Sequence, residues 1–352
     1  MSNAQLSDYE RQIQAYRDGL LRRDDAILSI TERGWRIVQR GIWRDLDRLL
    51  KRIADAEAKG EKVKPSWLRD QIRSLDLLPQ VEAQITQWAL SLAPTITAGQ
   101  EAAITMAGEH AEGLVRAQLG DRATWNTLPV SAVQETIGRL ADGSPLVDYL
   151  RGFGPAAATA AEETLIAGVA TGRGVKAIAA DLAKIFGQSG AVDPGSVGRR
   201  AMLTARSSVL SAYRQSSLLN YQNNSDVVTA WIWTCAKSSR TCMSCISRDG
   251  KVYPLDTFMP AHLGCRCSLR PKTKTYRELG IDAPEPVGTI ETGAQWFARQ
   301  DDSTQRQMMG IAAHGMWRQG KISLTDFEGL RHDARWGDQA YQRPLREIVA
   351  RG

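Results

Sequence analysis

The feature that most constrains the fold of this chain is a cluster of metal-binding residue types. Four of its five cysteines and one of its four histidines fall between residues 242 and 267. Cys242 and Cys245 form a Cys-x-x-Cys turn, which lets two sulfurs point at one ion. Three further donors follow, namely His262, Cys265 and Cys267. The sequence therefore predicts a structural Zn²⁺ that joins a small hairpin to a later loop.

The spacing leaves open which donors bind the ion, because a tetrahedral zinc takes four ligands and five are present. Cys265 and Cys267 would face opposite ways on an extended strand, so one of the two could lie outside the set of metal ligands. A reduced core cluster, or a disulfide formed after cell lysis, is the alternative to a metal. Cys235 is interpreted as a buried thiol; the weaker alternative is that it replaces one of the five donors as a metal ligand. A catalytic zinc is disfavoured, because no His-Glu-x-x-His pattern occurs.

Composition places the chain among ordinary globular proteins. Hydrophobic residues make up 43% and charged residues 24% of its 352 residues, which is typical of folded domains. No run of about eighteen apolar residues occurs, so we expect no membrane contact through a spanning helix. The first residues lack the pattern of a secretory signal. An odd, clustered set of cysteines argues against an extracellular disulfide framework and favours folding in a reducing cytoplasm.

The apolar pattern predicts an α+β fold that is mainly helical. Recurrence every three or four positions predicts helices over residues 5–58, 66–122, 156–186 and 199–223. β-branched and aromatic runs predict the two strands of a hairpin, 227–233 and 251–253. The cysteine cluster would lie on this hairpin and its loops, and Pro271 would close the module. Short helices are predicted in the tail near 294–317, 323–327 and 344–351.

Turn-forming and linker segments divide this pattern into three predicted regions. Residues 1–150 form a helical N-terminal region. Residues 156–275 form a helical domain that carries the small Cys/His-stapled β-hairpin module. Residues 289–352 form a short helical tail, which follows a linker rich in proline and glycine.

A basic stripe marks the N-terminal helix of this chain, whose net charge is +6. Its arginines recur three or four residues apart, at Arg33, Arg36, Arg40, Arg44 and Arg48. On one helix they would form a stripe flanking the apolar seam of Ile42, Leu46 and Leu49. Such a stripe suits DNA phosphates, bound without sequence preference, or an acidic protein surface. A solvated charged face is the alternative.

The order of motifs around the cysteines resembles a known phage family. Two tryptophans on a strand precede the Cys-x-x-Cys turn, called here the knuckle. A second turn and a short strand follow it, and the His-x-x-Cys-x-Cys segment ends the series. These are Trp231, Trp233, Arg240-Thr241-Cys242, Asp249-Gly250-Lys251-Val252-Tyr253-Pro254, Pro260 and His262–Cys267. The preceding Ala212-Tyr213-Arg214 resembles the upstream helix of the same family. Over about residues 160–275 the chain is similar to the phage Mu F-like, or SPP1-type, head morphogenesis proteins.

This resemblance implies a minor head protein of a tailed bacteriophage or prophage. Such proteins are virion components that associate with the portal protein and the procapsid interior and act in capsid assembly. The N-terminal helical region would then face the portal or the interior, and its basic helix would meet portal side chains or packaged DNA. Localisation would be the virion head, after assembly in the host bacterial cytoplasm. A structural rather than an enzymatic role is expected, because no enzyme signature stands out in the sequence.

Two other classes of function stay open from the residues alone. A zinc-dependent nuclease or DNA-binding enzyme would need further histidines or acids near His262, and only Asp249 and Asp256 are offered. A zinc-stapled interaction module in a non-viral protein is the second. No phosphate-binding loop and no nucleophile elbow occurs in the sequence. His314 and His332 in the tail are interpreted as packed or solvated residues.

Overall fold

The computed structural model describes residues 3–120, 124–188, 195–285 and 290–350. The chain divides into two compact units, each assembled from separate segments. Unit 1 takes residues 1–24, 99–143 and 207–352, and unit 2 takes residues 25–98 and 144–206. Long helices contribute residues to both units: α1 (Asn3–Ala58), α4 (Ala93–Leu119) and α8 (Val197–Asn223). The prediction of a mainly helical α+β fold is confirmed; the boundaries of the three predicted sequence regions stay a prediction.

Unit 2 is helical in its described residues. Besides its parts of the long helices it holds α2 (Pro65–Ser74), α3 (Leu77–Ser91), α5 (Leu146–Arg151), α6 (Phe153–Ala170) and α7 (Val175–Phe186). Proline at the first position of α2 has no amide hydrogen to lose there. The seam of α1 predicted from Ile42, Leu46 and Leu49 is fully buried. At about 100° per residue, the exposed arginines of α1 lie on the side opposite this seam, and not beside it as predicted.

Close approach of helices characterises the core of unit 2. Trp35 and Trp88 pack with ring centroids 4.9 Å apart. A Cβ atom at Gly154 in α6 would overlap the carbonyl oxygen of Glu82 in α3, and one at Gly198 would overlap the Trp35 ring. These two positions therefore need glycine for space rather than for backbone conformation. Because the helices pack this closely, a small increase in side-chain volume at these positions would strain the core.

A three-stranded antiparallel sheet forms the centre of unit 1, in the order β2–β1–β3. Its strands are β1 (Val228–Thr234), β2 (Val252–Pro254) and β3 (Ser268–Thr273). Trp231 in β1 lies opposite Tyr253 on one side and Pro271 on the other. The predicted hairpin is thus present, but the expectation that Pro271 closes the module is wrong. Proline is tolerated inside β3 because β3 is an edge strand, where one side of the backbone needs no partner.

The tail of unit 1 contains more elements than the sequence predicted. Its helices are α10 (Gly293–Ala298), α11 (Asp302–Met309), α12 (Ile311–Arg318), η3 (Leu324–Phe327) and α13 (Leu345–Val349). Three of these replace the single helix predicted near 294–317, because Asp301 caps a new helix and Gly310 adopts a φ of 90°. A hairpin of β4 (Glu328–Asp333) and β5 (Gly337–Gln342) was not predicted.

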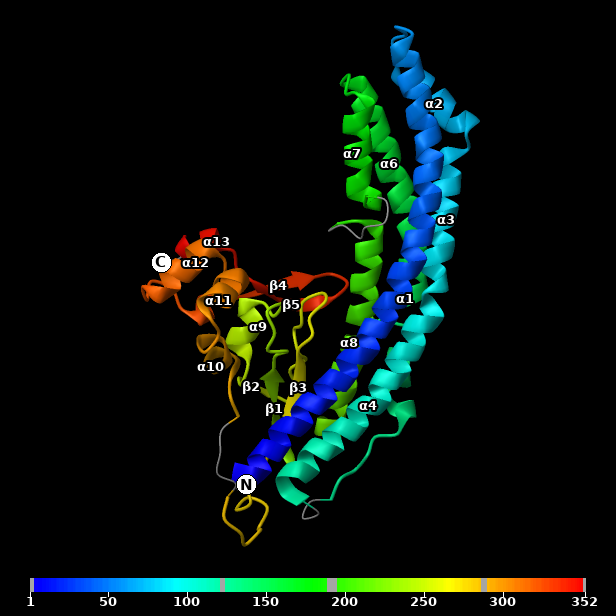
Figure 1. Ribbon diagram of the computed structural model, residues 1–352. Helices are drawn as coiled ribbons and strands as arrows, with labels where there is room; N and C mark the ends of the chain where they lie inside the picture. The colour runs from blue at the N-terminus through cyan, green and yellow to red at the C-terminus, as the bar shows by residue number, and fades with distance from the viewer. Residues whose placement is uncertain (1–2, 121–123, 189–194, 286–289, 351–352) are drawn as a thin grey trace. The chain divides into compact units, whose positions relative to one another are not determined.

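This C-terminal hairpin, β4 with β5, contacts α9 (Met243–Arg248), the helix that follows the first cysteine of the cluster. Figure 1 shows the hairpin beside α9. The 3-10 helix η2 (Val130–Thr136) also belongs to this unit. Across the described part of the chain, every helix is too short or too polar to cross a lipid bilayer.

Candidate metal centre

The cluster gathers donors from two segments of unit 1. Cys242 is the N-cap residue of α9 and Cys245 lies in its first turn, while His262 and Cys265 lie in the loop between β2 and β3. His262 Nε2 lies 3.5 Å from Cys242 Sγ and 3.6 Å from Cys245 Sγ. Cys245 Sγ lies 3.8 Å from Cys265 Sγ. Zinc bond lengths of about 2.0–2.3 Å in a tetrahedron give ligand separations of about 3.6–3.8 Å, so these distances suit one shared ion.

Cys267 belongs to the same cluster. Among the described residues two groups of possible ligands occur, Cys242 with Cys245 and His262, and Cys245 with Cys265 and Cys267. Within each group the ligand atoms lie within 4.8 Å of one another, and Cys245 is common to both. The fold therefore brings together all five donors that the sequence singled out. Cys235, the weaker alternative, lies in neither group.

The charges of the cluster suit a cation. The hydrogen bond from Cys245, and then the contacts with His262, lower the pKa of Cys242 to about 5. Hydrogen bonds from Cys245 and Cys267 hold the pKa of Cys265 well below its usual range. Burial alone would lower the pKa of His262, but the neighbouring sulfurs of Cys265 and Cys242 outweigh it and raise this pKa to about 11. Two of the sulfurs are therefore poised as thiolates, the form that binds metal.

The orientation of His262 is fixed by its second ring nitrogen. Nδ1 lies 2.9 Å from the backbone carbonyl oxygen of Leu263, to which it donates when protonated. Nε2 is then the nitrogen that faces the three sulfurs, as a ligand must. A backbone carbonyl in this second position is the usual partner of a metal-binding histidine and sets which nitrogen carries the lone pair.

A buried arginine from α8 holds the ligand loop. Arg214 is 3% exposed, and its Nε donates to the Cys267 carbonyl at 2.9 Å. One terminal nitrogen donates to the carbonyls of Cys265 and Cys267 at 2.7 and 2.8 Å. Ser207, two turns earlier along α8, accepts a hydrogen bond of 3.0 Å from the Gly264 amide. The sequence singled out Arg214 by resemblance alone; its contact with the cluster crosses 53 positions and left no local signal.

The C-terminal hairpin contacts both ligand-bearing segments. The Met243 amide donates to the Gln342 side chain at 2.8 Å, and the Ala340 amide donates to the Pro260 carbonyl at 2.6 Å. Glu328 accepts from Ser247 in α9 at 2.5 Å and pairs with Lys251 at the same distance. The hairpin thus bridges α9 and the loop before His262. Sequence reasoning missed this role because it predicted only helices in the tail.

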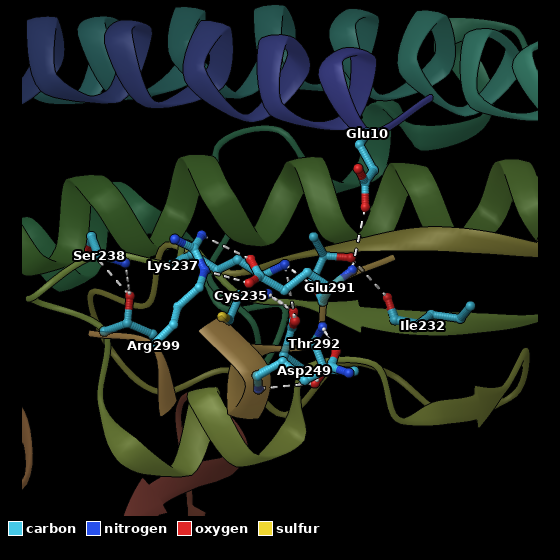
Figure 2. Close-up of polar contacts among 12 residues, drawn as sticks. Glu10, Ile232, Cys235, Lys237, Ser238, Asp249, Glu291, Thr292 and Arg299 are labelled. Atoms are coloured by element: carbon cyan, nitrogen blue, oxygen red, sulfur yellow. Dashed lines mark hydrogen bonds and ion pairs between the residues drawn. The ribbon is translucent and has the colours of Figure 1, made fainter. Parts of the chain in front are cut away.

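Asp249, part of the predicted turn, anchors a second buried network (Figure 2). Its Oδ1 accepts from the Cys235 amide at 2.5 Å, and its Oδ2 lies 3.7 Å from Lys237 Nζ. Lys237 also donates to the carbonyl of Glu291 at the start of the tail. Burial raises the pKa of Asp249 and also that of the Cys235 thiol. Asp249 therefore joins the end of β1 to the tail and does not face His262.

The other histidines and acids make separate contacts. His314 is buried and lies 3.1 Å from Gln305 Oε1, and exposed His332 lies 2.9 Å from Asp338 Oδ1. Across the described ranges, the groups of possible metal ligands contain His262 and cysteines, without a carboxylate. The acids that a zinc nuclease would place beside His262 are thus not supplied by Asp249 or Asp256 in this structure.

Comparison with known proteins supports the resemblance predicted from the motif order. Residues 159–270 match the family model described as Phage Mu protein F like protein. No curated protein and no solved structure matches the chain. The matched range begins within α6, contains α8 with Arg214, and includes all five donors of the cluster. The similarity to the phage Mu protein F-like family therefore extends over residues 159–270 of this chain.

Proposed function

We propose that this protein is a minor head protein of a tailed bacteriophage or prophage and acts in head morphogenesis. The observation that carries the proposal is the family match over residues 159–270, the range that holds the complete Cys/His cluster. The protein would be assembled into the head in the host bacterial cytoplasm and remain as a virion component. The proposed role is structural, because the groups of possible ligands among the described residues consist of His262 and cysteines, a donor set typical of structural zinc.

The proposed partners are the portal protein and the procapsid interior. The helical region of residues 1–150 is the part proposed to face them, and the tail of residues 289–352 completes the Cys/His module. The exposed arginines of α1 supply positive charge for an anionic partner, either packaged DNA or an acidic protein surface.

The cluster is proposed to hold one structural Zn²⁺. The distances favour Cys242, Cys245, His262 and Cys265 as ligands, with Cys267 as an additional sulfur beside them. Zinc with three thiolates and a neutral imidazole carries a net charge of about −1. Arg214 is a buried cation whose bonds to the ligand loop go to carbonyls. A buried charge is stable only when it is paired, and an anionic zinc centre would provide the balancing charge for Arg214.

The test is where the protein is found in cells that produce particles. Lysates of an induced lysogen are separated by gradient sedimentation, and each fraction is analysed for this chain, the portal and the major capsid protein. We expect the chain to sediment with procapsids or portal rings and to stay with heads after DNA removal by nuclease. Its presence in soluble fractions only, while capsid protein sediments normally, would contradict the proposal.

A further inference from the structure

The outer face of α1 in unit 2 carries exposed apolar residues among its arginines. Ile37 is 65% exposed and Ile30 is 45% exposed. Single exposed isoleucines are common on protein surfaces. These two are seven residues apart, so they lie on the same side of the helix, separated by two turns or about 10 Å. They lie opposite the buried seam that contains Trp35 and Ile42.

The arginines interleave with these isoleucines at regular spacing. The series Ile30, Arg33, Ile37, Arg40 and Arg44, called here the outer face of α1, advances by alternate steps of three and four residues. All five are exposed. This spacing places one side chain per turn along a narrow line, which is the geometry of a helix that packs lengthwise against another helix.

The charge of the outer face is only partly compensated within the protein. Arg36 and Arg48, at its borders, pair with Glu32 at 2.5 Å and Asp45 at 3.4 Å. In the part of the chain that the structure describes, Arg40 and Arg44 lie in no ion pair. The line therefore presents two apolar side chains and at least two uncompensated positive charges toward solvent.

We propose that the outer face of α1 docks an acidic amphipathic helix of a protein partner. The partner helix would place apolar residues seven positions apart against Ile30 and Ile37, and carboxylates against Arg33, Arg40 and Arg44. The positive charge of the outer face favours an acidic partner, and the spacing of three and four residues favours a partner that is helical. The inference rests on the proposed function to the extent that the partner is another head component.

Duplex DNA fits this face less well. Phosphates offer nothing apolar to Ile37, so its exposed surface would gain no burial there. Asp47, exposed three residues after Arg44, would repel phosphates, whereas a protein partner accommodates it with a lysine. A second copy of the chain would bring the same cationic line against this one, which like-charge repulsion disfavours.

The test measures binding of the full chain, purified with its metal, to defined probes at a salt concentration of about 0.15 M. The first probe is a synthetic acidic helix of about 28 residues, or four heptads, with leucines seven residues apart and flanking glutamates. The second replaces those glutamates by lysines. The third is a random-sequence DNA duplex of about 20 base pairs. Fluorescence anisotropy gives the affinities, and sedimentation gives the oligomeric state.

Matched variants separate the apolar from the charged contribution. Ile37→Ser should weaken binding of the acidic peptide roughly tenfold, because it removes most of one buried side chain from the interface. Its control is Ile311→Ser, at a position that is 80% exposed in unit 1. The double variant Arg40→Gln, Arg44→Gln should weaken binding and flatten its salt dependence. Its control is Arg73→Gln, whose side chain is also 80% exposed.

Selective binding of the acidic peptide, lost in the Ile37 and arginine variants and kept in both controls, is the expected result. Three outcomes would each overturn the inference. They are absence of peptide binding, tighter binding of the duplex that Ile37→Ser leaves unchanged, and a dimer that Ile37→Ser dissociates. Particle incorporation of the wild-type chain is scored separately. A wild-type chain that enters heads but ignores the peptide removes this inference and leaves the proposed function standing.

Discussion

The helical core of unit 2 and the Cys/His module of unit 1 are stabilised by different kinds of interaction. In unit 2, long helices bury large side chains such as Trp35 and approach closely at Gly154 and Gly198. The sheet of the module has three strands, of seven, three and six residues, and α9 and the loop that carries His262 lie between them in the sequence. So small a sheet depends on packing against other elements for its stability, and Trp231 and Trp233 share one apolar cluster with residues of α4, α8 and the tail. The comparison teaches that the module needs cross-links, and the structure offers donors, buried ion contacts and the C-terminal hairpin as those links.

The strongest way to break this comparison is to remove the metal ligands. In the double variant Cys242→Ser, Cys245→Ser we expect bound zinc to fall from near one per chain to near zero. Metal-binding free energy is folding free energy in such modules, so amide hydrogen exchange in β1–β3 should become fast. Exchange in α3 and α6 of unit 2 should stay slow. Elemental analysis and exchange mass spectrometry measure the two effects.

Cys235→Ser is the matched control, because this cysteine lies outside both ligand groups. It should keep its zinc. Wild-type protein that is purified under reducing conditions without zinc, and a double variant as stable as wild type, would together contradict a metal-stabilised module.

The reverse experiment introduces a methyl group into unit 2. Gly154→Ala would place a Cβ against the Glu82 carbonyl oxygen and the Thr86 side chain. We expect overpacking to lower the free energy of unfolding by about 2–3 kcal/mol, which would be measured as faster amide hydrogen exchange in α3 and α6. Gly174→Ala is the control, because Gly174 has no neighbouring atom within 4 Å of an added Cβ. Equal stability of the two variants would show that the close approach at Gly154 does not limit the packing. Zinc content should be unchanged in both.

A smaller effect sharpens the comparison within the module. Arg214→Lys keeps the positive charge but cannot bond two carbonyls at once with a planar fork. We expect zinc affinity to fall about 10- to 100-fold, as for other residues that support metal ligands. Competition with a chromophoric chelator measures it. Arg199→Lys, on the exposed side of the same helix, should bind zinc like the wild type. An unchanged affinity in Arg214→Lys would mean that the ligand loop holds its shape without the arginine.

The smallest expected effect is a pH dependence confined to unit 1. His110 stacks on Tyr16 with ring centroids 3.9 Å apart and lies 2.9 Å from the Tyr213 hydroxyl. Burial lowers the pKa of His110 to about 4 from its usual 6.5. The folded state therefore holds this ring neutral. Its contribution to stability is present above pH 6.5 and is lost as the pH falls toward about 4.

Thermal unfolding of wild type and His110→Gln between pH 7 and pH 4.5 tests this dependence. Acid also protonates the cluster, so the informative quantity is the difference between the two proteins at each pH. We expect this difference to favour the wild type at pH 7 and to shrink as the pH falls. His332→Gln serves as the control at an exposed histidine. A difference that stays constant with pH would mean that His110 does not titrate between the two states.

The sequence predicted long helices and the donor set well, because both leave local signals. Apolar periodicity marks α1 and α8, and two cysteines spaced by two residues mark the knuckle. β3 escaped prediction because its residues include Pro271 and two basic side chains, which disfavour a strand. The C-terminal hairpin has few β-branched residues and is held by contacts with α9 far away in sequence. Arg214 and Gln342 likewise act on the cluster only once tertiary structure has formed.

The C-terminal hairpin also gives the cluster a dependence on the order of protein synthesis. All five donors leave the ribosome before the hairpin does, and β5 follows Cys267 by about 75 residues. The Met243 amide donates its hydrogen bond to Gln342, which is 99 positions downstream. A nascent chain can therefore bind metal early but cannot cover α9 until β5 has also been synthesised. Chains that stop before β5 would keep every donor and expose α9, which distinguishes them from chains that carry the hairpin.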